Sequence, residues 1–204
     1  MVFLFRLRIM LRFTDWVAQG SDAMSHITSY SVMPIPPVEA NTRWFDAGAV
    51  RIGVQYRLLD DAIAAAADAG LGAAAGGERG QTTGLDDRGV ALHVVAEQDG
   101  EWREFLRFDC FQEDPHYHYV SQRARKNEML HLDPIADGDA LAWALERIRT
   151  RLPQMLARAG APEVAARLDA RELEDALPRV AEAAYRARYE SDAASVRAAA
   201  LAKS

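Results

Sequence analysis

Residues 103–119 constrain the fold of this chain more than any other stretch, because their side chains alternate in character with a period of two. The segment reads REFLRFDCFQEDPHYHY, with aromatic, charged and imidazole groups at alternating positions. Alternation of this kind is typical of β-strands. The acidic stretch 112–115 ends in Pro115, which predicts a tight turn. We therefore expect two antiparallel strands here, residues 102–111 and 116–120.

Further strands are predicted on either side of this pair. Residues 50–58 alternate cleanly, residues 90–97 form a second apolar run, and residues 129–132 are a candidate fifth strand. Asp99 and Gly100 mark a hairpin. A three-residue loop with Gly100 in the left-handed conformation separates apolar from polar side chains better than a two-residue loop, so we choose that register. It places these residues on the core face: Val90, Leu92, Val94, Ala96, Trp102, Leu106, Phe108 and Cys110.

The C-terminal part of the chain is predicted to be helical. Apolar residues over 141–159 recur at the spacing of one helical face, Asp137 or Asp139 provides the N-cap, and Pro153 should kink the helix. Asp169 begins another helix. Strands followed by helices are typical of the α+β class. We therefore expect an antiparallel sheet of four to five strands, with the C-terminal helices packed on one face.

The chain divides into three predicted parts. Residues 1–47 are an N-terminal extension and an extended arm, partly disordered, because residues 33–37 read MPIPP and proline removes backbone donors. Residues 48–169 form the α+β domain. Residues 170–204 form a C-terminal helix that frays at its end, where alanine replaces the larger apolar side chains.

Three smaller segments outside the predicted sheet have interpretations of their own. Met24 is interpreted as the biological start, so that the first 23 residues are dispensable for folding. Residues 60–69 are rich in alanine and predict a short helix. Residues 70–87 are dominated by glycine, alanine, threonine and charge, which predicts a mobile surface loop.

The composition narrows the classes of function. The chain has 24 Lys and Arg against 30 Asp and Glu, a formal net charge of −6, which argues against general nucleic-acid binding. Cys110 is the only cysteine, so no intrachain disulfide can form and the cytoplasm is the expected location. We expect no transmembrane segment, because the apolar N-terminal stretch is short and interrupted by arginine.

Candidate functional side chains gather on the face of the sheet opposite the core, and we expect this face to be open. A four-residue turn pairs Phe111 with His116 and Asp109 with His118, so both histidines join the face. The face then consists of Arg51, Arg57, His93, Arg103, Phe105, Arg107, Asp109, Phe111, His116 and His118.

Three functional interpretations compete with that of an ordinary solvated surface. The first is a protein interface, since aromatic side chains with arginine suit a homodimer or another partner. The second is a divalent-metal site formed by His116, His118 and Asp109, because His-x-His on a strand directs both imidazoles to one side. Arg107 opposes a cation there. The third is recognition of an anion or a base by arginine and phenylalanine.

The leading prediction is a soluble binding domain without a cofactor, which uses this face as a homodimer or partner interface. The alternative is a divalent-metal-binding domain, for which hydrolysis is one conceivable activity. An enzyme is not the leading interpretation. No G-x-S-x-G or H-E-x-x-H motif occurs, and Cys110 is predicted on the core face, away from the histidines.

The motif RFDCF at residues 107–111, followed by PHYHY at 115–119, resembles an uncharacterised bacterial family of small α+β domains. The similarity extends over about residues 50–169 and includes Leu132-Asp-Pro and the helix that contains Trp143. It implies a domain identity and no established activity.

Overall fold

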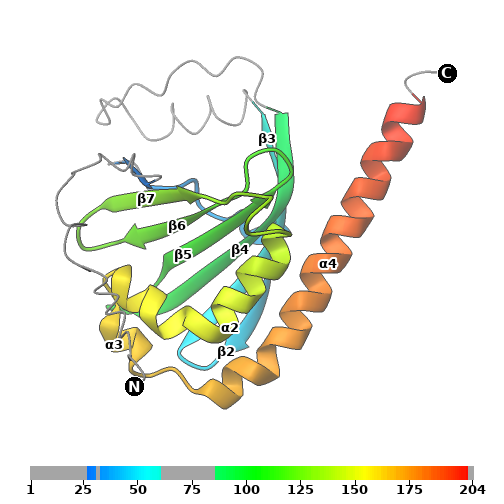
Figure 1. The fold of residues 1–204 in the computed structure, drawn as a ribbon. Helices are drawn as coiled ribbons and strands as arrows, with labels where there is room; N and C mark the ends of the chain where they lie inside the picture. The colour runs from blue at the N-terminus through cyan, green and yellow to red at the C-terminus, as the bar shows by residue number, and fades with distance from the viewer. Residues whose placement is uncertain (1–26, 31–32, 61–85, 202–204) are drawn as a thin grey trace, which may run out of the picture.

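A computed structural model describes residues 27–30, 33–60 and 86–201. Most of the predicted N-terminal extension, the predicted helix at 60–69 and most of the predicted loop at 70–87 lie outside these residues. The described part is α+β, with an antiparallel sheet followed by helices (Figure 1).

The sheet has seven strands in the order β1-β7-β6-β5-β4-β3-β2, and every neighbouring pair is antiparallel. The sequence predicted four or five strands. The two that it missed, β1 and β2, are edge strands of four and five residues, too short for a clear alternation. The strands are β1 Ile27–Tyr30, β2 Arg43–Ala47, β3 Val50–Asp60, β4 Asp86–Gln98, β5 Glu101–Phe111, β6 His116–Ser121 and β7 Lys126–His131.

Three α-helices follow the sheet: α2 Ala140–Arg158, α3 Pro162–Ala165 and α4 Ala170–Leu201. A short 3-10 helix, η1 Glu39–Asn41, precedes β2. Helices α2 and α4 lie on the same side of the sheet (Figure 1). One hydrophobic core joins side chains of both helices to side chains of the sheet.

This core extends beyond residues 48–169 at both ends. Phe45 on β2 is part of it, and so are Leu173 and Leu177 on α4. Two strands of the sheet, β1 and β2, and the turns of α4 that pack on β2 therefore lie outside the predicted limits of the α+β domain.

The hairpin between β4 and β5 differs from the predicted register. Gln98 pairs with Glu101, so the turn has two residues, and both Asp99 and Gly100 have positive φ, 56° and 79°. This is the pattern of a type I′ turn. The register then shifts in a β-bulge at Phe105, which lies between the pairs Val95–Glu104 and Val94–Leu106.

Residues 102–105 lie between the two-residue turn and the end of the bulge, and each of them is on the face opposite to the one predicted. Arg103 pairs with core residue Ala96, and Phe105 is 1% exposed in the core, whereas both were predicted on the polar face. Trp102 pairs with Glu97 and is 46% exposed, whereas it was predicted in the core. Beyond the bulge, Leu106 and the even-numbered residues that follow lie on the core face as predicted.

The pairing of β5 with β6 also differs from the prediction, by two residues. Asp109 pairs with His116 and Arg107 pairs with His118. The connection is longer than expected because the buried carboxylate of Asp87 accepts hydrogen bonds from the backbone N–H groups of residues 112, 113 and 114, at 2.9–3.1 Å. A shift of two preserves the face, so both histidines still project to the polar side.

Of the two predicted N-caps of α2, the structure selects Asp139, whose Oδ1 accepts from the backbone N–H of Ala142 at 2.8 Å. Its Oδ2 also accepts from Arg188 on α4 at 2.7 Å. Asp139→Ala should therefore lower the free energy of unfolding by roughly 0.5–2 kcal/mol. Urea denaturation followed by circular dichroism measures this. Asp137→Ala is the matched control, and an equal loss in that variant would contradict the assignment.

Candidate metal centre

The polar face of the sheet is buried, not open as predicted. His93, Arg107 and Asp109 are 0%, 2% and 4% exposed. Part of the cover comes from Trp44 on β2, whose ring packs on Gly53 so closely that a Cβ there would lie 2.6 Å from it. The arm before β2 also contributes, since the backbone N–H of Val38 donates to the buried side chain of residue 55 at 3.2 Å. The charged side chains of this face must therefore satisfy one another.

The first group of buried charges centres on Glu104, which the bulge places on this face. Arg107 donates to both of its carboxylate oxygens, from Nε at 3.0 Å and from Nη2 at 2.6 Å. Nδ1 of His93 lies 2.6 Å from the same carboxylate. Burial alone would raise the pKa of Glu104, but the charge of Arg107 and the hydrogen bond with His93 lower it to about 2. Arg107 is thereby engaged by Glu104.

The second group centres on Asp109. Its Oδ2 lies 3.4 Å from Nε2 of His116 and 3.3 Å from Nε2 of His118. Its Oδ1 is buried without a hydrogen-bond partner and lies 3.9 Å from Nη1 of Arg57. Among the described residues, Asp109, His116 and His118 form the group whose ligand atoms all lie within 4.8 Å of one another.

The other nitrogen of each imidazole has an acceptor. Nδ1 of His116 lies 2.7 Å from the backbone carbonyl of Asp114, and Nδ1 of His118 lies 2.8 Å from Oδ1 of Asn127. An acceptor at Nδ1 holds the proton there, so that a neutral ring directs the lone pair of Nε2 toward Asp109. This is how ligating histidines are oriented around metal ions.

The pKa shifts of the three groups follow from this geometry. Burial would raise the pKa of Asp109, but hydrogen bonds with both histidines hold it well below its usual value. Burial would lower the pKa of His116, but the contact with Asp109 raises it. For His118, burial dominates and lowers the pKa, and the nearby charge of His116 acts in the same direction.

The two ligand separations that involve Asp109 match a tetrahedral metal site better than they match hydrogen bonds. Two ligand atoms about 2.0–2.1 Å from a tetrahedral zinc ion lie roughly 3.3–3.4 Å apart. Charge-assisted N–H···O bonds are shorter, about 2.7–2.9 Å. The observed 3.3 and 3.4 Å between the imidazoles and Oδ2 fall in the first range.

A family model for a domain of unknown function, DUF7700, matches residues 44–184. The chain belongs to the DUF7700 family. No curated protein and no solved structure matches it. The match runs from β2 to the middle of α4, so the DUF7700 domain contains both groups of buried charges. None of the helices in the described part of the chain is long and apolar enough to cross a membrane.

The DUF7700 domain brings together most of the site residues predicted from the sequence. His93 and Arg107 both contact Glu104, and Asp109 contacts the two histidines. The ring of Phe111 meets that of His116 edge-on, with the ring centroids 5.7 Å apart. Arg103 and Phe105 do not join them, because the bulge puts both on the other face. Cys110 is buried on the core side, and burial raises the pKa of its thiol.

Sequence reasoning missed Glu104 and Asn127. Glu104 reaches the polar face only because of the bulge, for which the sequence has no clear signal. Asn127 could have been found from its position, since a polar residue that pairs with buried Val120 needs a hydrogen-bond partner on the same face.

Proposed function

We propose that this DUF7700 domain binds a divalent metal ion, best matched by zinc, through Asp109, His116 and His118. The observation that carries the proposal is the approach of two imidazole Nε2 atoms to one carboxylate oxygen, while both Nδ1 atoms have acceptors. A lone pair and an anion repel each other when buried together unless a cation lies between them. A divalent ion held by Asp109 and both Nε2 atoms would serve this purpose.

The arginines do not prevent this, although the sequence placed Arg107 where its charge would oppose a cation. Arg107 donates to Glu104, and Arg57 is 3.9 Å from the Asp109 oxygen that does not contact the histidines. With a divalent ion bound, the ion and the two arginines together carry a charge of about +4, and the carboxylates of Asp109 and Glu104 carry about −2. The site then has an excess positive charge of about two. An anionic fourth ligand is therefore favoured.

Three protein ligands are the number found in catalytic zinc sites, whereas structural sites have four. We propose that the fourth position takes a hydroxide or an anionic oxygen of a substrate. An ion held there would supply a lowered pKa for a bound water, so hydrolysis is the reaction class that this ligand set favours. The chain itself would hold the ion and orient both imidazoles through residues 114 and 127.

The proposal is tested by elemental analysis of the purified chain after dialysis. We expect about one equivalent of zinc or another first-row divalent ion, and loss of at least nine-tenths of it in His118→Ala. His131→Ala is the matched control. The centroid of the His131 ring lies 5.9 Å from that of His116, but Nδ1 of His131 contacts the exposed carboxylate of Asp114, so His131 is not one of the proposed ligands. Metal content in the control should equal that of the wild type.

Occupancy should also depend on pH. Protons compete with the ion for the imidazoles, so affinity should fall as pH falls below about 6.5. A metal-free protein that also fails to bind added zinc at pH 7.5 would contradict the proposal. So would equal retention of zinc by the wild type and His118→Ala.

The interaction domain predicted from the sequence required an open face. In this structure Arg107, Asp109 and both histidines are buried, so a partner protein cannot contact them. That the chain forms a homodimer stays a prediction, which light scattering of the purified chain measures directly.

A further inference from the structure

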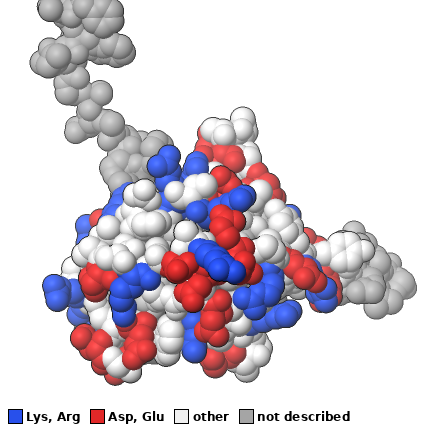
Figure 2. Space-filling view, turned by 90° about the horizontal axis from the view of Figure 1, so that it is seen from below, with Lys and Arg blue, Asp and Glu red and all other residues white. Residues whose placement is uncertain are grey.

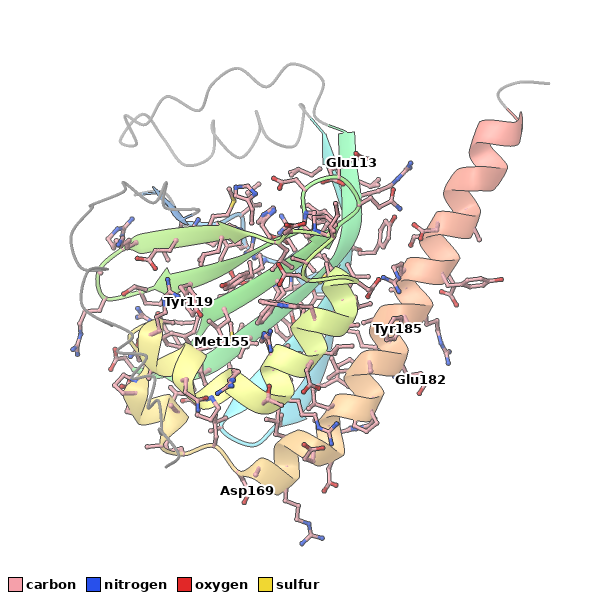
Figure 3. The ribbon with its side chains drawn as sticks, viewed as in Figure 1. Glu113, Tyr119, Met155, Asp169, Glu182 and Tyr185 are labelled. Carbon is pink, nitrogen blue, oxygen red and sulfur yellow. The ribbon has the colours of Figure 1, made fainter. Side chains whose placement is uncertain are left out.

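A groove of about 300 Å³ lies on the helical side of the sheet, between β6 and the face of α2. Tyr117 and Tyr119 form its floor from β6. Figure 3 shows Tyr119 and Met155, which line it from the two elements. The polar face with Asp109 is on the other side of the sheet, so the groove is separate from the candidate metal centre. Its lining is Tyr117, Tyr119, Trp143, Arg147, Arg151, Gln154, Met155 and Arg158.

Aromatic rings make up one part of this lining. The centroids of Tyr117 and Trp143 are 5.1 Å apart, and those of Tyr117 and Tyr119 are 5.7 Å apart. The indole Nε1 of Trp143 is buried and has no hydrogen-bond partner. A buried donor without an acceptor costs free energy, and this donor belongs to a side chain that lines the groove.

Arginines make up the other part, and none of the groove's lining residues is acidic. The guanidinium of Arg147 stacks on Trp143 at 4.9 Å, and that of Arg158 stacks on Tyr119 at 4.0 Å. Arg158 also donates to Glu128 at 3.2 Å. Arg147 and Arg151 are one turn apart on α2, so they line the same side.

This concentration of positive charge is local. The whole chain has a formal net charge of −6. On the face shown in Figure 2, basic and acidic side chains are interspersed. The groove, which has three arginines and no acidic residue in its lining, therefore differs in charge from the chain as a whole.

We propose that this groove binds a nucleotide, with the phosphate held by Arg147 and Arg151 and the base against the aromatic rings. Arginine forks match phosphate oxygens, and bases stack on aromatic side chains. A phosphate monoester carries a charge of about −1.5 to −2, which complements the arginines once Glu128 has paired with Arg158. The volume suits one nucleotide, near the lower limit of small-molecule sites. Such a unit occurs both as a free nucleotide and within a single strand.

The test is calorimetric titration of the full chain with adenosine monophosphate, adenosine, ribose 5-phosphate and a hexameric oligo(dA). EDTA is present throughout, so that the result does not depend on the metal centre. We expect the monophosphate to bind at least tenfold more tightly than adenosine or ribose 5-phosphate. If the hexamer binds more than tenfold more tightly than the monophosphate, the natural ligand is a single strand. If it binds equally or more weakly, the natural ligand is a free nucleotide.

Variants locate the site. Arg147→Gln/Arg151→Gln should weaken binding at least tenfold while leaving the melting temperature within a few degrees. Arg149→Gln is the matched control on the same helix, because Arg149 pairs with Glu174 at 2.9 Å and does not line the groove. Its affinity should equal that of the wild type. The proposal is overturned if no nucleotide probe binds at millimolar concentration, or if the control loses as much affinity as the double variant.

Discussion

Arg107→Met should lower the free energy of unfolding by about 3–5 kcal/mol, the range for breaking a buried ion pair from one side. The substitution keeps most of the side-chain length and removes the charge that holds Glu104. Glu104 would then remain buried and ionised, with only His93 as a partner. Guanidinium denaturation followed by tryptophan fluorescence measures the loss.

Two comparisons separate this effect from a general effect of the substitution. Arg103→Met, four residues away on β5, removes a pair whose other member, Glu101, is 72% exposed, and should cost less than about 1 kcal/mol. Glu104→Gln combined with Arg107→Met should recover part of the stability, because no unpaired carboxylate is then buried. If Arg107→Met unfolds no more easily than Arg103→Met, the buried pair is not present in solution.

The pair should also give the protein a pH dependence with a definite sign. The pKa of Glu104 falls from 4.5 to about 2 in the folded state. A lowered carboxyl pKa contributes stability that is present above the unfolded value and lost as pH falls through the folded value. The difference in unfolding free energy between the wild type and Arg107→Met should therefore shrink between pH 4.5 and pH 2. A difference that stays constant across this window would contradict the coupling.

Phe105→Ala should lower the free energy of unfolding by roughly 3–5 kcal/mol, as for other large-to-small changes of a buried aromatic. Phe105 is 1% exposed, and the bulge turns it into the core. The register predicted from the sequence gives the opposite expectation, a mild effect compared with Phe108→Ala. Chemical denaturation of both variants distinguishes the two registers.

Trp102→Ala is the matched control for the bulge. The predicted register buries Trp102, whereas the structure leaves it 46% exposed, where the guanidinium of Arg51 stacks on it at 4.1 Å. The loss should be about 1 kcal/mol or less. A Trp102→Ala variant less stable than Phe105→Ala would show that the strand follows the predicted register and that Glu104 does not reach the polar face.

The alternation of side chains by itself determined which face most of the sheet residues occupy. Leu92, Leu106 and Phe108 lie in the core, and Asp109, His116 and His118 share the opposite face, as their sequence positions predict. This succeeded although the β5–β6 register was wrong by two residues. A period of two makes the face depend only on whether a shift is odd or even. The same patterning identified the α+β class and the helix over 141–159, whereas the choice between Asp137 and Asp139 as its N-cap came from the structure.

Only the tertiary structure decided what the polar face is. A single extra residue at Phe105 moved that side chain into the core and placed Glu104 where it engages Arg107. Packing of Trp44 against Gly53 contributes to the burial of a face that alternation alone marked as polar. Local pattern specifies on which side of a strand a side chain projects. Whether that side meets water depends on segments distant in the chain, and burial in turn decides whether histidine and aspartate act as surface charges or as candidate ligands.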